Sequence, residues 1–224
     1  MSSRRTLNQT EGSKNPATKF LEWKSNDKSF SYYNKAKGEN IPVKLPFKFQ
    51  FLEHFHTVKG WNDASSSQIY ANEVKFISQE PLTVKAFKKK GDIAEGLYSE
   101  IRGAIGDAGG HYSRSIYVID DSGEIINIQL KGAAVSSYVD FMDEHENQIE
   151  GAWVTVNKAE DKKKGAVKFS VPVFEIGKAF TPKEMELAND KYQDIVSYFD
   201  KYSKKDVEVE EPETVEEEVD ELAF

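Results

Sequence analysis

A strict alternation of apolar and polar side chains between residues 41 and 51 constrains this chain more than any other feature. The apolar positions are Ile41, Val43, Leu45, Phe47, Phe49 and Phe51, and the positions between them are Pro42, Lys44, Pro46, Lys48 and Gln50. A period of two places one set on a buried face and the other toward solvent, so the stretch predicts a β-strand. Proline has no amide hydrogen for a ladder, so Pro42 and Pro46 favour an edge or a bend.

Shorter β-rich runs occupy much of the remaining chain. They cover residues 18–24, 29–34, 69–77, 82–88, 114–119, 124–130, 152–157 and 166–175. The sequences Ser25-Asn26-Asp27 and Asp120-Asp121-Ser122-Gly123 predict turns that join two pairs of these runs as hairpins. Residues 57–68 are rich in Gly, Asn, Asp and Ser and predict a loop, and a basic loop over residues 158–165 joins the last two strands.

Three helices are predicted. Asp92 followed by Glu95 forms a capping-box pattern, and the apolar residues that follow keep to one stripe, so residues 93–106 predict an amphipathic helix. Residues 133–145 also show helical spacing. The third helix begins at Thr181–Glu184, where an N-cap residue, a proline and a glutamate stand in the order that starts a helix.

These elements predict a mainly β fold in which a helix interrupts the strands midway. An OB-type barrel has five strands and a helix between its third and fourth strands, and it fits this order with extra hairpins added. A doubly wound α/β fold would need regular strand–helix alternation, which the chain lacks. We expect a flexible arm over residues 1–16, the OB-like domain over 17–180, a C-terminal helix over 181–205 and a disordered acidic tail over 206–224.

The tail carries most of the charge of the chain. Residues 206–224 include ten Asp or Glu and no Lys, Arg or His, and they end in Leu222, Ala223 and Phe224. Such a block repels itself and predicts disorder. Removing these ten from the 38 acidic residues leaves 28 against 30 lysines and arginines, so the body is mildly basic. This asymmetry points to nucleic-acid partners, whereas the simpler alternative is a tail that only improves solubility.

Composition excludes several classes of protein. The chain has no cysteine, so it has neither disulfides nor thiolate metal sites. No apolar run approaches the roughly 20 residues that cross a bilayer. Residues 1–16 are basic but hold no apolar segment, which argues against a secretory signal. We therefore expect a cytoplasmic protein without a membrane partner.

Two histidines form the one pattern that suggests a metal site. His54 and His56 are two residues apart, so they share one face of a strand, as some zinc sites require. No third ligand stands at a suggestive spacing. Ordinary strand histidines are the favoured interpretation.

Acidic and glycine-rich motifs are also explained without catalysis. Asp120, Asp121 and Glu124 are acids of the kind that hold Mg²⁺ in nucleases, but the hairpin turn accounts for them. The spacing Gly103-x-x-Gly106-x-x-Gly109 lies at a predicted helix end rather than after a strand, so it predicts a helix stop and not a phosphate loop. We expect no enzyme, no metal and no cofactor.

Basic residues beside aromatic ones recur along the chain, which is the pattern that single-stranded nucleic acid binding uses. A cationic groove takes the phosphates, and aromatic faces take the bases. The candidate residues are Trp23, Lys24, Tyr32, Tyr33, Lys35, Lys37, Lys48, Lys59, Trp61, Lys88, Lys89, Lys90, Tyr112, Arg114, Lys131, Lys162, Lys163 and Lys164. Trp61 is the strongest stacking candidate because its predicted loop offers no core to enter.

Each of these residues also has a structural alternative. The lysine runs could be solvated turns, as such runs commonly are. Tyr32 and Tyr33 are adjacent on a strand, so one of them faces the core. Phe47, Phe49 and Phe51 share the apolar face and are expected to be core rather than stacking residues.

The end of the chain resembles the C-terminal tip of single-stranded DNA-binding proteins. In Val219–Phe224, acidic residues precede a short apolar segment that ends in Phe, although Ala223 stands where bacterial members have Pro. The body resembles the single-stranded DNA-binding proteins in replication modules of crAss-like and related phages of Bacteroidetes. The stretches that carry this resemblance are residues 20–33, 72–87, 95–101 and 128–134.

This resemblance implies an OB-like fold, no enzymatic activity and a role in phage DNA replication or recombination in the host cytoplasm. The protein would coat single-stranded DNA without strong sequence preference. The tail would compete for the groove and recruit replication partners through Asp220, Glu221, Leu222 and Phe224. The alternative is an interaction or virion-associated protein whose tail docks onto another protein. Oligomerisation is left open.

Overall fold

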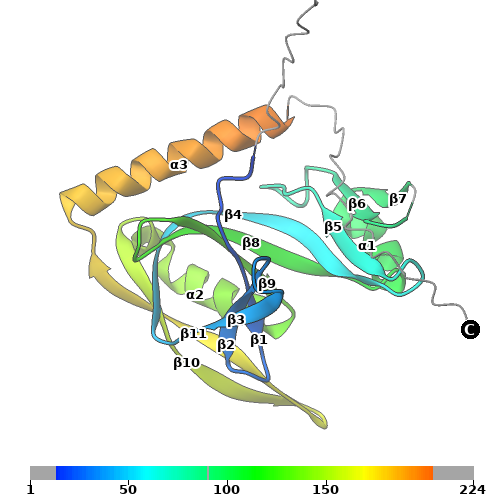
Figure 1. The fold of residues 1–224 in the computed structure, drawn as a ribbon, viewed down its shortest axis with the longest axis horizontal. Coiled ribbons are helices and arrows are strands. Elements are labelled where there is room, and N and C mark those ends of the chain that lie inside the picture. The colour runs from blue at the N-terminus through cyan, green and yellow to red at the C-terminus, as the bar shows by residue number, and fades with distance from the viewer. Residues whose placement is uncertain (1–13, 90, 204–224) are drawn as a thin grey trace, which may run out of the picture.

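The computed structural model describes residues 14–89 and 91–203, which form eleven strands and three helices (Figure 1). The strands are β1 (Phe20–Lys24), β2 (Ser29–Asn34), β3 (Glu39–Val43), β4 (Phe47–Asn62), β5 (Ser67–Ala71), β6 (Leu82–Ala86), β7 (Asp92–Gly96), β8 (Gly110–Asp120), β9 (Ile125–Lys131), β10 (Ala152–Lys164) and β11 (Val167–Ala179). The helices are α1 (Tyr98–Asp107), α2 (Ala133–Ile149) and α3 (Pro182–Ser203). The predicted mainly β class is confirmed. No helix in these two ranges is long and apolar enough to cross a membrane.

One mixed sheet contains all of these strands. Its order is β3-β2-β1-β9-β8-β4-β5-β6-β7, and the β10–β11 hairpin joins it through the first half of β4. The pairings are antiparallel except that of β1 with β9. The long strand β4 therefore belongs to two regions, because it pairs with β10 at one end and with β5 at the other.

Five strands follow the predicted OB order. They are β4, β8, β9, β10 and β11, with α2 between the third and the fourth. The sheet is open by its strand pairings in the described chain, because β1 and its hairpin with β2 occupy the free edge of β9. Hydrogen bonds connect β1 and the turn after it to β11 across this opening of the sheet. The indole N–H of Trp23 donates to the Ser170 carbonyl at 2.9 Å, and the Ser25 hydroxyl accepts from the Ser170 amide at 2.6 Å.

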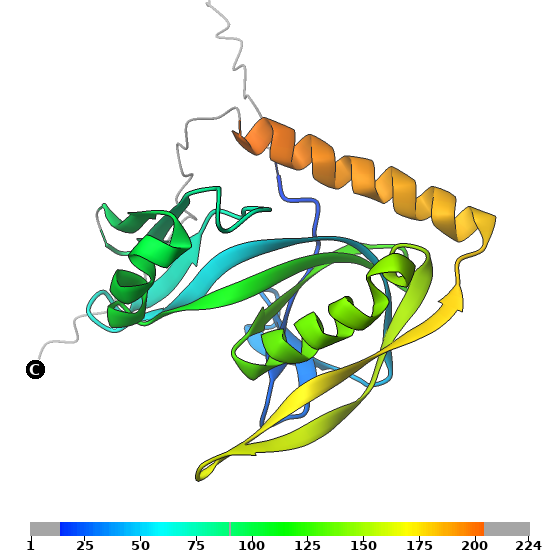
Figure 2. The ribbon, with the colours of Figure 1, turned by 180° about the vertical axis from the view of Figure 1, so that it is seen from behind.

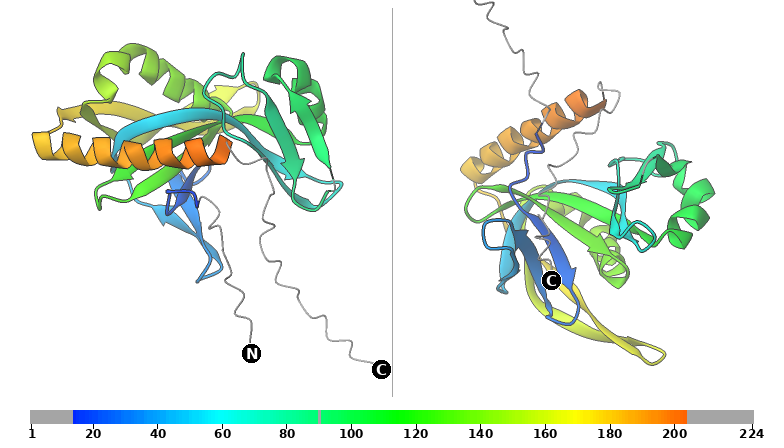
Figure 3. Two further views of the ribbon diagram at one scale, coloured as in Figure 1. Left: turned by 90° about the horizontal axis from the view of Figure 1, so that it is seen from above. Right: turned by 45° about the vertical axis from the view of Figure 1, so that its right-hand side comes forward.

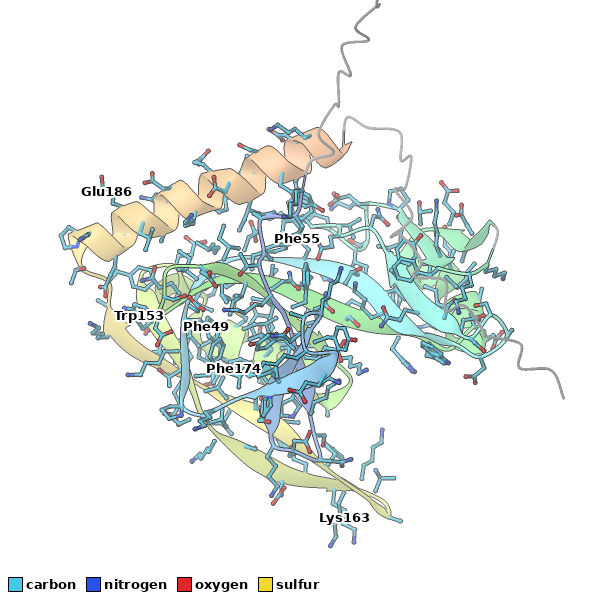
Figure 4. The ribbon with its side chains drawn as sticks, in the orientation of Figure 1. Phe49, Phe55, Trp153, Lys163, Phe174 and Glu186 are labelled. Atoms are coloured by element: carbon cyan, nitrogen blue, oxygen red, sulfur yellow. The ribbon has the colours of Figure 1, made fainter. Side chains whose placement is uncertain are left out.

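The main core lies between α2 and the inner face of these strands (Figure 2). Phe49 of β4 and Phe174 of β11 point into it, where Tyr138 and Phe141 of α2 pack against Phe174 (Figure 4). The predicted core role of Phe47, Phe49 and Phe51 is confirmed, since each is buried. Because side chains alternate between the two faces of a strand, the residues between these core residues point to the outer face of the sheet.

Two smaller cores fix the remaining helices. On the outer face, Phe199 of α3 stacks on Phe55 of β4 with ring centroids 4.1 Å apart, so α2 and α3 lie on opposite sides of the sheet (Figure 3). The predicted start of α3 is confirmed, because the Thr181 hydroxyl accepts from the Glu184 amide and the Glu184 carboxylate accepts from the Thr181 amide. Helix α1 covers β5 to β7 through Ile105.

Several predicted boundaries were wrong. The alternating stretch over residues 41–51 is two strands, because the chain bends between β3 and β4 at the cis Leu45–Pro46 bond. Residues 92–96 form β7 rather than the first turn of a helix, because they pair with β6. Residues 57–62 and 158–164 belong to β4 and β10, because their neighbours supply ladder partners that a single sequence does not reveal. Residues 1–13 of the predicted arm over residues 1–16, and the tail over residues 206–224, lie outside the described residues.

Candidate nucleic-acid interface

A groove of about 760 Å³ lies on the outer face of the sheet. Its floor crosses β1, β9, β8, β4 and β5, and its wall at one end is the last part of α3 with Tyr198 and Phe199. The insertion of residues 63–109 between β4 and β8 forms the opposite end. The groove therefore lies outside the OB-like core, between the OB-like strands and the 63–109 insertion.

Trp61 is the most exposed large side chain in this groove, with 52% of its surface accessible. It lies near the end of β4 and pairs with Gln68 of β5, so it is held by a strand rather than by the predicted loop. Its backbone N–H donates to the Gly109 carbonyl at 3.3 Å. A β-carbon on Gly109, which has φ of +89°, would lie 2.2 Å from the Trp61 carbonyl oxygen, so this approach requires glycine.

Further aromatic rings face the same side. Phe20 on β1 is 43% exposed, and Phe87 after β6 is 45% exposed and packs on Tyr70 of β5 with ring centroids 4.6 Å apart. All three line the groove. Tyr33 is 59% exposed and shares this face of the sheet, because Glu22 of β1 is opposite Ser31 of β2 and alternate residues share a face. Aromatic surface thus runs across several strands.

Two of the predicted lysines enter the groove. Lys59 of β4 and Lys131 of β9 line it together with His111 of β8, which is directly opposite Lys59 in the ladder. Burial lowers the pKa of Lys59, while the neighbouring carboxyls of Glu73 and Glu22 counteract that shift. These side chains offer hydrogen-bond donors beside the aromatic surface.

Three carboxyl groups also line the groove, from Glu22, Asp63 and Glu73. The Tyr117 hydroxyl donates to Glu73 at 2.7 Å, and burial raises the pKa of Glu73 despite this bond. Burial acts to raise the pKa of Glu22 too, but the ammonium of Lys24 at 2.7 Å holds that pKa below its usual value. The floor of the groove is therefore mixed in charge rather than uniformly basic.

Other predicted lysines do not line the groove. Lys48 lies on the far half of β4 in a separate hollow with Tyr32. Lys35 and Lys37 are exposed in the turn between β2 and β3, and Lys88 and Lys89 are exposed directly after Phe87. The side chain of Lys90 lies outside the described residues.

Three lysines lie at the end of the β10–β11 hairpin, which projects from the body. These are Lys162, Lys163 and Lys164, and the label of Lys163 marks the tip (Figure 4). Lys162 forms an ion pair with Glu160 at 3.3 Å. Lys163 is directly opposite Lys168 in the ladder, so two cations face each other across the hairpin.

Four predicted residues do not face the groove. Trp23 is a core residue with only 8% of its surface exposed, and Tyr32 packs against the same core. Tyr112 and Arg114 lie on the opposite face of β8 and contact His56, at 2.7 Å and 2.9 Å respectively. Alternation accounts for each correction, since neighbouring residues on a strand point to opposite sides.

The histidine pair and the acidic turn have structural roles. His54 bonds to the Tyr138 hydroxyl at 2.9 Å, and burial lowers the pKa of both His54 and His56 to about 4. Asp120 accepts from the amides of Ser122 and Glu124, which shapes the hairpin turn. Among the described residues, no group of three metal-ligating side chains comes together.

Phe20, Tyr70, Phe87 and His111 were missed by sequence reasoning. Period-two alternation could have found two of them, because Phe20 alternates with buried Leu21 and Phe87 follows buried Ala86. Glu73 was missed because it lies in an irregular segment between β5 and β6. Comparison with protein-family models, curated proteins and solved structures finds no match.

Proposed function

We propose that this protein binds single-stranded DNA in the outer groove. The observation that carries the proposal is the gathering of Phe20, Trp61, Phe87 and two lysines on one outer sheet face. OB-type folds bind oligonucleotides on the face of their second and third strands and with the adjacent loops. Here those strands are β8 and β9, and the corresponding connections are the 63–109 insertion and the β10–β11 turn.

The groove suits unpaired bases because its aromatic rings are already exposed. Stacking of a base on such a ring contributes about 1–3 kcal/mol and tolerates any sequence. Paired bases in a duplex are stacked on each other and cannot lie flat on these rings. The exposed lysines around the groove supply charge for the phosphates, and we expect binding to weaken steeply with salt as counterions are released.

The acidic tail is proposed to compete for these lysines. It follows α3 in the sequence, and the last part of α3 carries Tyr198 and Phe199 at the wall of the groove. DNA would displace the tail and leave Leu222 and Phe224 available to recruit replication or recombination proteins. A role in phage replication rests on the resemblance of the body and of the tail tip.

Binding to a labelled single strand of mixed sequence, and to a duplex of equal length, tests the proposal. We expect the single strand to bind at least tenfold more tightly at moderate salt, with incubation in Mg²⁺ leaving the strand intact. Equal binding of both forms would contradict the proposed groove. Absence of binding to either would favour a protein that only docks onto other proteins through its tail.

A further inference from the structure

The charges in the groove differ from those of a phosphate track. Beside Lys59 and Lys131, the lining includes carboxyl groups from Glu22, Asp63 and Glu73. Carboxylates repel phosphates and cannot donate hydrogen bonds to them when ionised. The phosphates of a bound strand would therefore lie toward the rim, where Lys88 and Lys89 follow directly after Phe87.

The bases would then face the floor. A base stacked on Trp61 or Phe87 would present its hydrogen-bonding edge within the same groove that Glu73 lines. An ionised carboxylate offers about four lone-pair positions. The hydroxyl of Tyr117 occupies one position on Glu73, at 2.7 Å, and Ser115 supplies a second hydrogen bond. Burial raises the pKa of Glu73, while these two hydrogen bonds and the ammonium of Lys59 favour its ionised form, in which acceptor capacity is left for a ligand.

Acceptors of this kind distinguish bases by their amino groups. Cytosine presents an N4 amino group and adenine an N6 amino group, and acidic side chains accept from the cytosine amino group in known readout. Thymine and uracil present a carbonyl oxygen at the equivalent position, which would face a carboxyl oxygen with no hydrogen between them. A floor lined by acids therefore favours one class of base.

We propose that the groove prefers bases with amino groups, cytosine above all, over thymine and uracil, and that Glu73 is a residue that sets this preference. The proposal deepens the proposed function and rests on it. It concerns base composition rather than a defined sequence, since the stacking surfaces accept any base. Glu22 is less available for this role because Lys24 pairs with it.

Oligo-dC and oligo-dU of equal length form the sharpest comparison, because these bases share ring size and lack the thymine methyl group. Fluorescence anisotropy at one salt concentration and neutral pH would measure both affinities for the full chain. We expect oligo-dC to bind roughly tenfold more tightly, which is the lower end for discrimination by a good side-chain–base pair. Equal affinities, or tighter binding of oligo-dU, would overturn the proposal.

Three variants test whether Glu73 sets the preference for cytosine over uracil. Glu73→Gln keeps the size of the side chain, and we expect it to reduce the dC/dU ratio at least threefold. Glu186→Gln removes the same charge from the exposed side of α3 and should keep the wild-type ratio (Figure 4). Asp63→Asn, in the exposed turn after β4, provides a second groove variant if Glu73→Gln lowers the unfolding midpoint.

The outcomes separate the two proposals. A wild-type protein that binds neither oligonucleotide contradicts the proposed function itself. A wild-type protein that binds both with a ratio near one contradicts only the base preference. A ratio that survives unchanged in both Glu73→Gln and Asp63→Asn shows that the acids do not set it.

Discussion

Gly60 faces Gly109 so closely that a β-carbon added to Gly60 would lie 2.2 Å from the Gly109 carbonyl oxygen. The same β-carbon would lie 2.8 Å from the Cα atom of Gly110. These contacts are to backbone atoms, which cannot move aside as a flexible side chain does. The backbones at the end of β4 and at the start of β8 therefore lie very close together, directly beside Trp61.

Gly60→Ala is therefore expected to destabilise the protein by about 1–3 kcal/mol through overpacking. Gly103→Ala is the matched control, because Gly103 lies within α1 and has no atom within 4 Å of an added β-carbon. That control should be neutral or stabilising by about 0.5–1 kcal/mol, since alanine favours helix. Urea unfolding of both variants measures the difference, and equal stability of Gly60→Ala and wild type would contradict the backbone contact.

Substitution of Trp61 should weaken DNA binding, whereas substitution of Trp23 should lower the stability of the fold. Trp61→Ala is expected to weaken single-strand binding by about 1–3 kcal/mol, because an exposed stacking surface is lost. Trp23→Ala is expected to lower the free energy of unfolding by about 3–5 kcal/mol, because a buried ring is removed from the core. Titration of DNA with unfolding controls checks both, and normal affinity in Trp61→Ala would place Trp61 outside the interface.

Acid should destabilise the fold through His54 and His56. Their pKa values of about 4 in the folded chain lie below the usual 6.5, so the unfolded chain binds more protons between these values. Stability then rises with pH across this window and is lost as pH falls from 6.5 toward 4. We expect a loss of at least about 2 kcal/mol for the pair.

Denaturant unfolding at pH 7, 5.5 and 4.5 measures this slope. His54→Gln with His56→Gln keeps polar side chains but removes the titration, so the slope should flatten. His111→Gln, at an exposed position of β8, serves as the control and should keep the wild-type slope. A double variant with an unchanged slope would assign the acid sensitivity to other groups.

The hairpin tip should contribute charge but not stability. Lys163 is directly opposite Lys168, and like charges opposite each other in a ladder are unfavourable. Replacing both by Gln should leave the unfolding midpoint equal or slightly higher. If both contact phosphates, the slope of log affinity against log salt should fall by about 1–2 units. A slope identical to that of wild type would show that DNA does not reach the hairpin tip.

Removal of residues 206–224 tests the competition between tail and DNA. We expect the shortened chain to bind single strands more tightly at low salt, because an acidic competitor tethered beside the groove is gone. The difference should shrink as salt rises and screens both interactions. Unchanged affinity at low salt would rule out competition and leave the tail with a role in partner binding alone.

Local patterns in the sequence predicted where many of the helices and strands lie but not which strands pair with each other. The start of α3 at Thr181 and the inward face of β4 were correctly predicted, since a capping box and an alternating face are local properties. The strand β7 was missed because its strand state depends on β6, and Trp61 was placed in a loop because the pairing of this segment with β5 was unknown.

The candidate site was predicted only in part, because strand pairings, which local sequence patterns do not reveal, bring its residues together. Lys59 and Trp61 come from β4 and Lys131 comes from β9, and composition alone could suggest each residue but not the proximity of these strands. Tyr112 and Arg114 were assigned to the wrong face, because single residues in a long strand do not reveal which side is covered by a helix. Phe20 and Phe87 could have been found from alternation, because each is next to an apolar residue, Leu21 or Ala86, that is buried.

The close meeting of β4 and β8 makes the 63–109 insertion modular. Trp61 and Gly109 are joined by a backbone hydrogen bond, so the segment leaves the end of β4 and returns to the start of β8 at one point. A short hairpin turn could span the same two ends without changing the registers of the OB-like strands. Yet the insertion carries Tyr70, Glu73 and Phe87, which form one side of the groove. Exchange of this single segment would thus be a route to new ligand preferences on an unchanged set of OB-like strands.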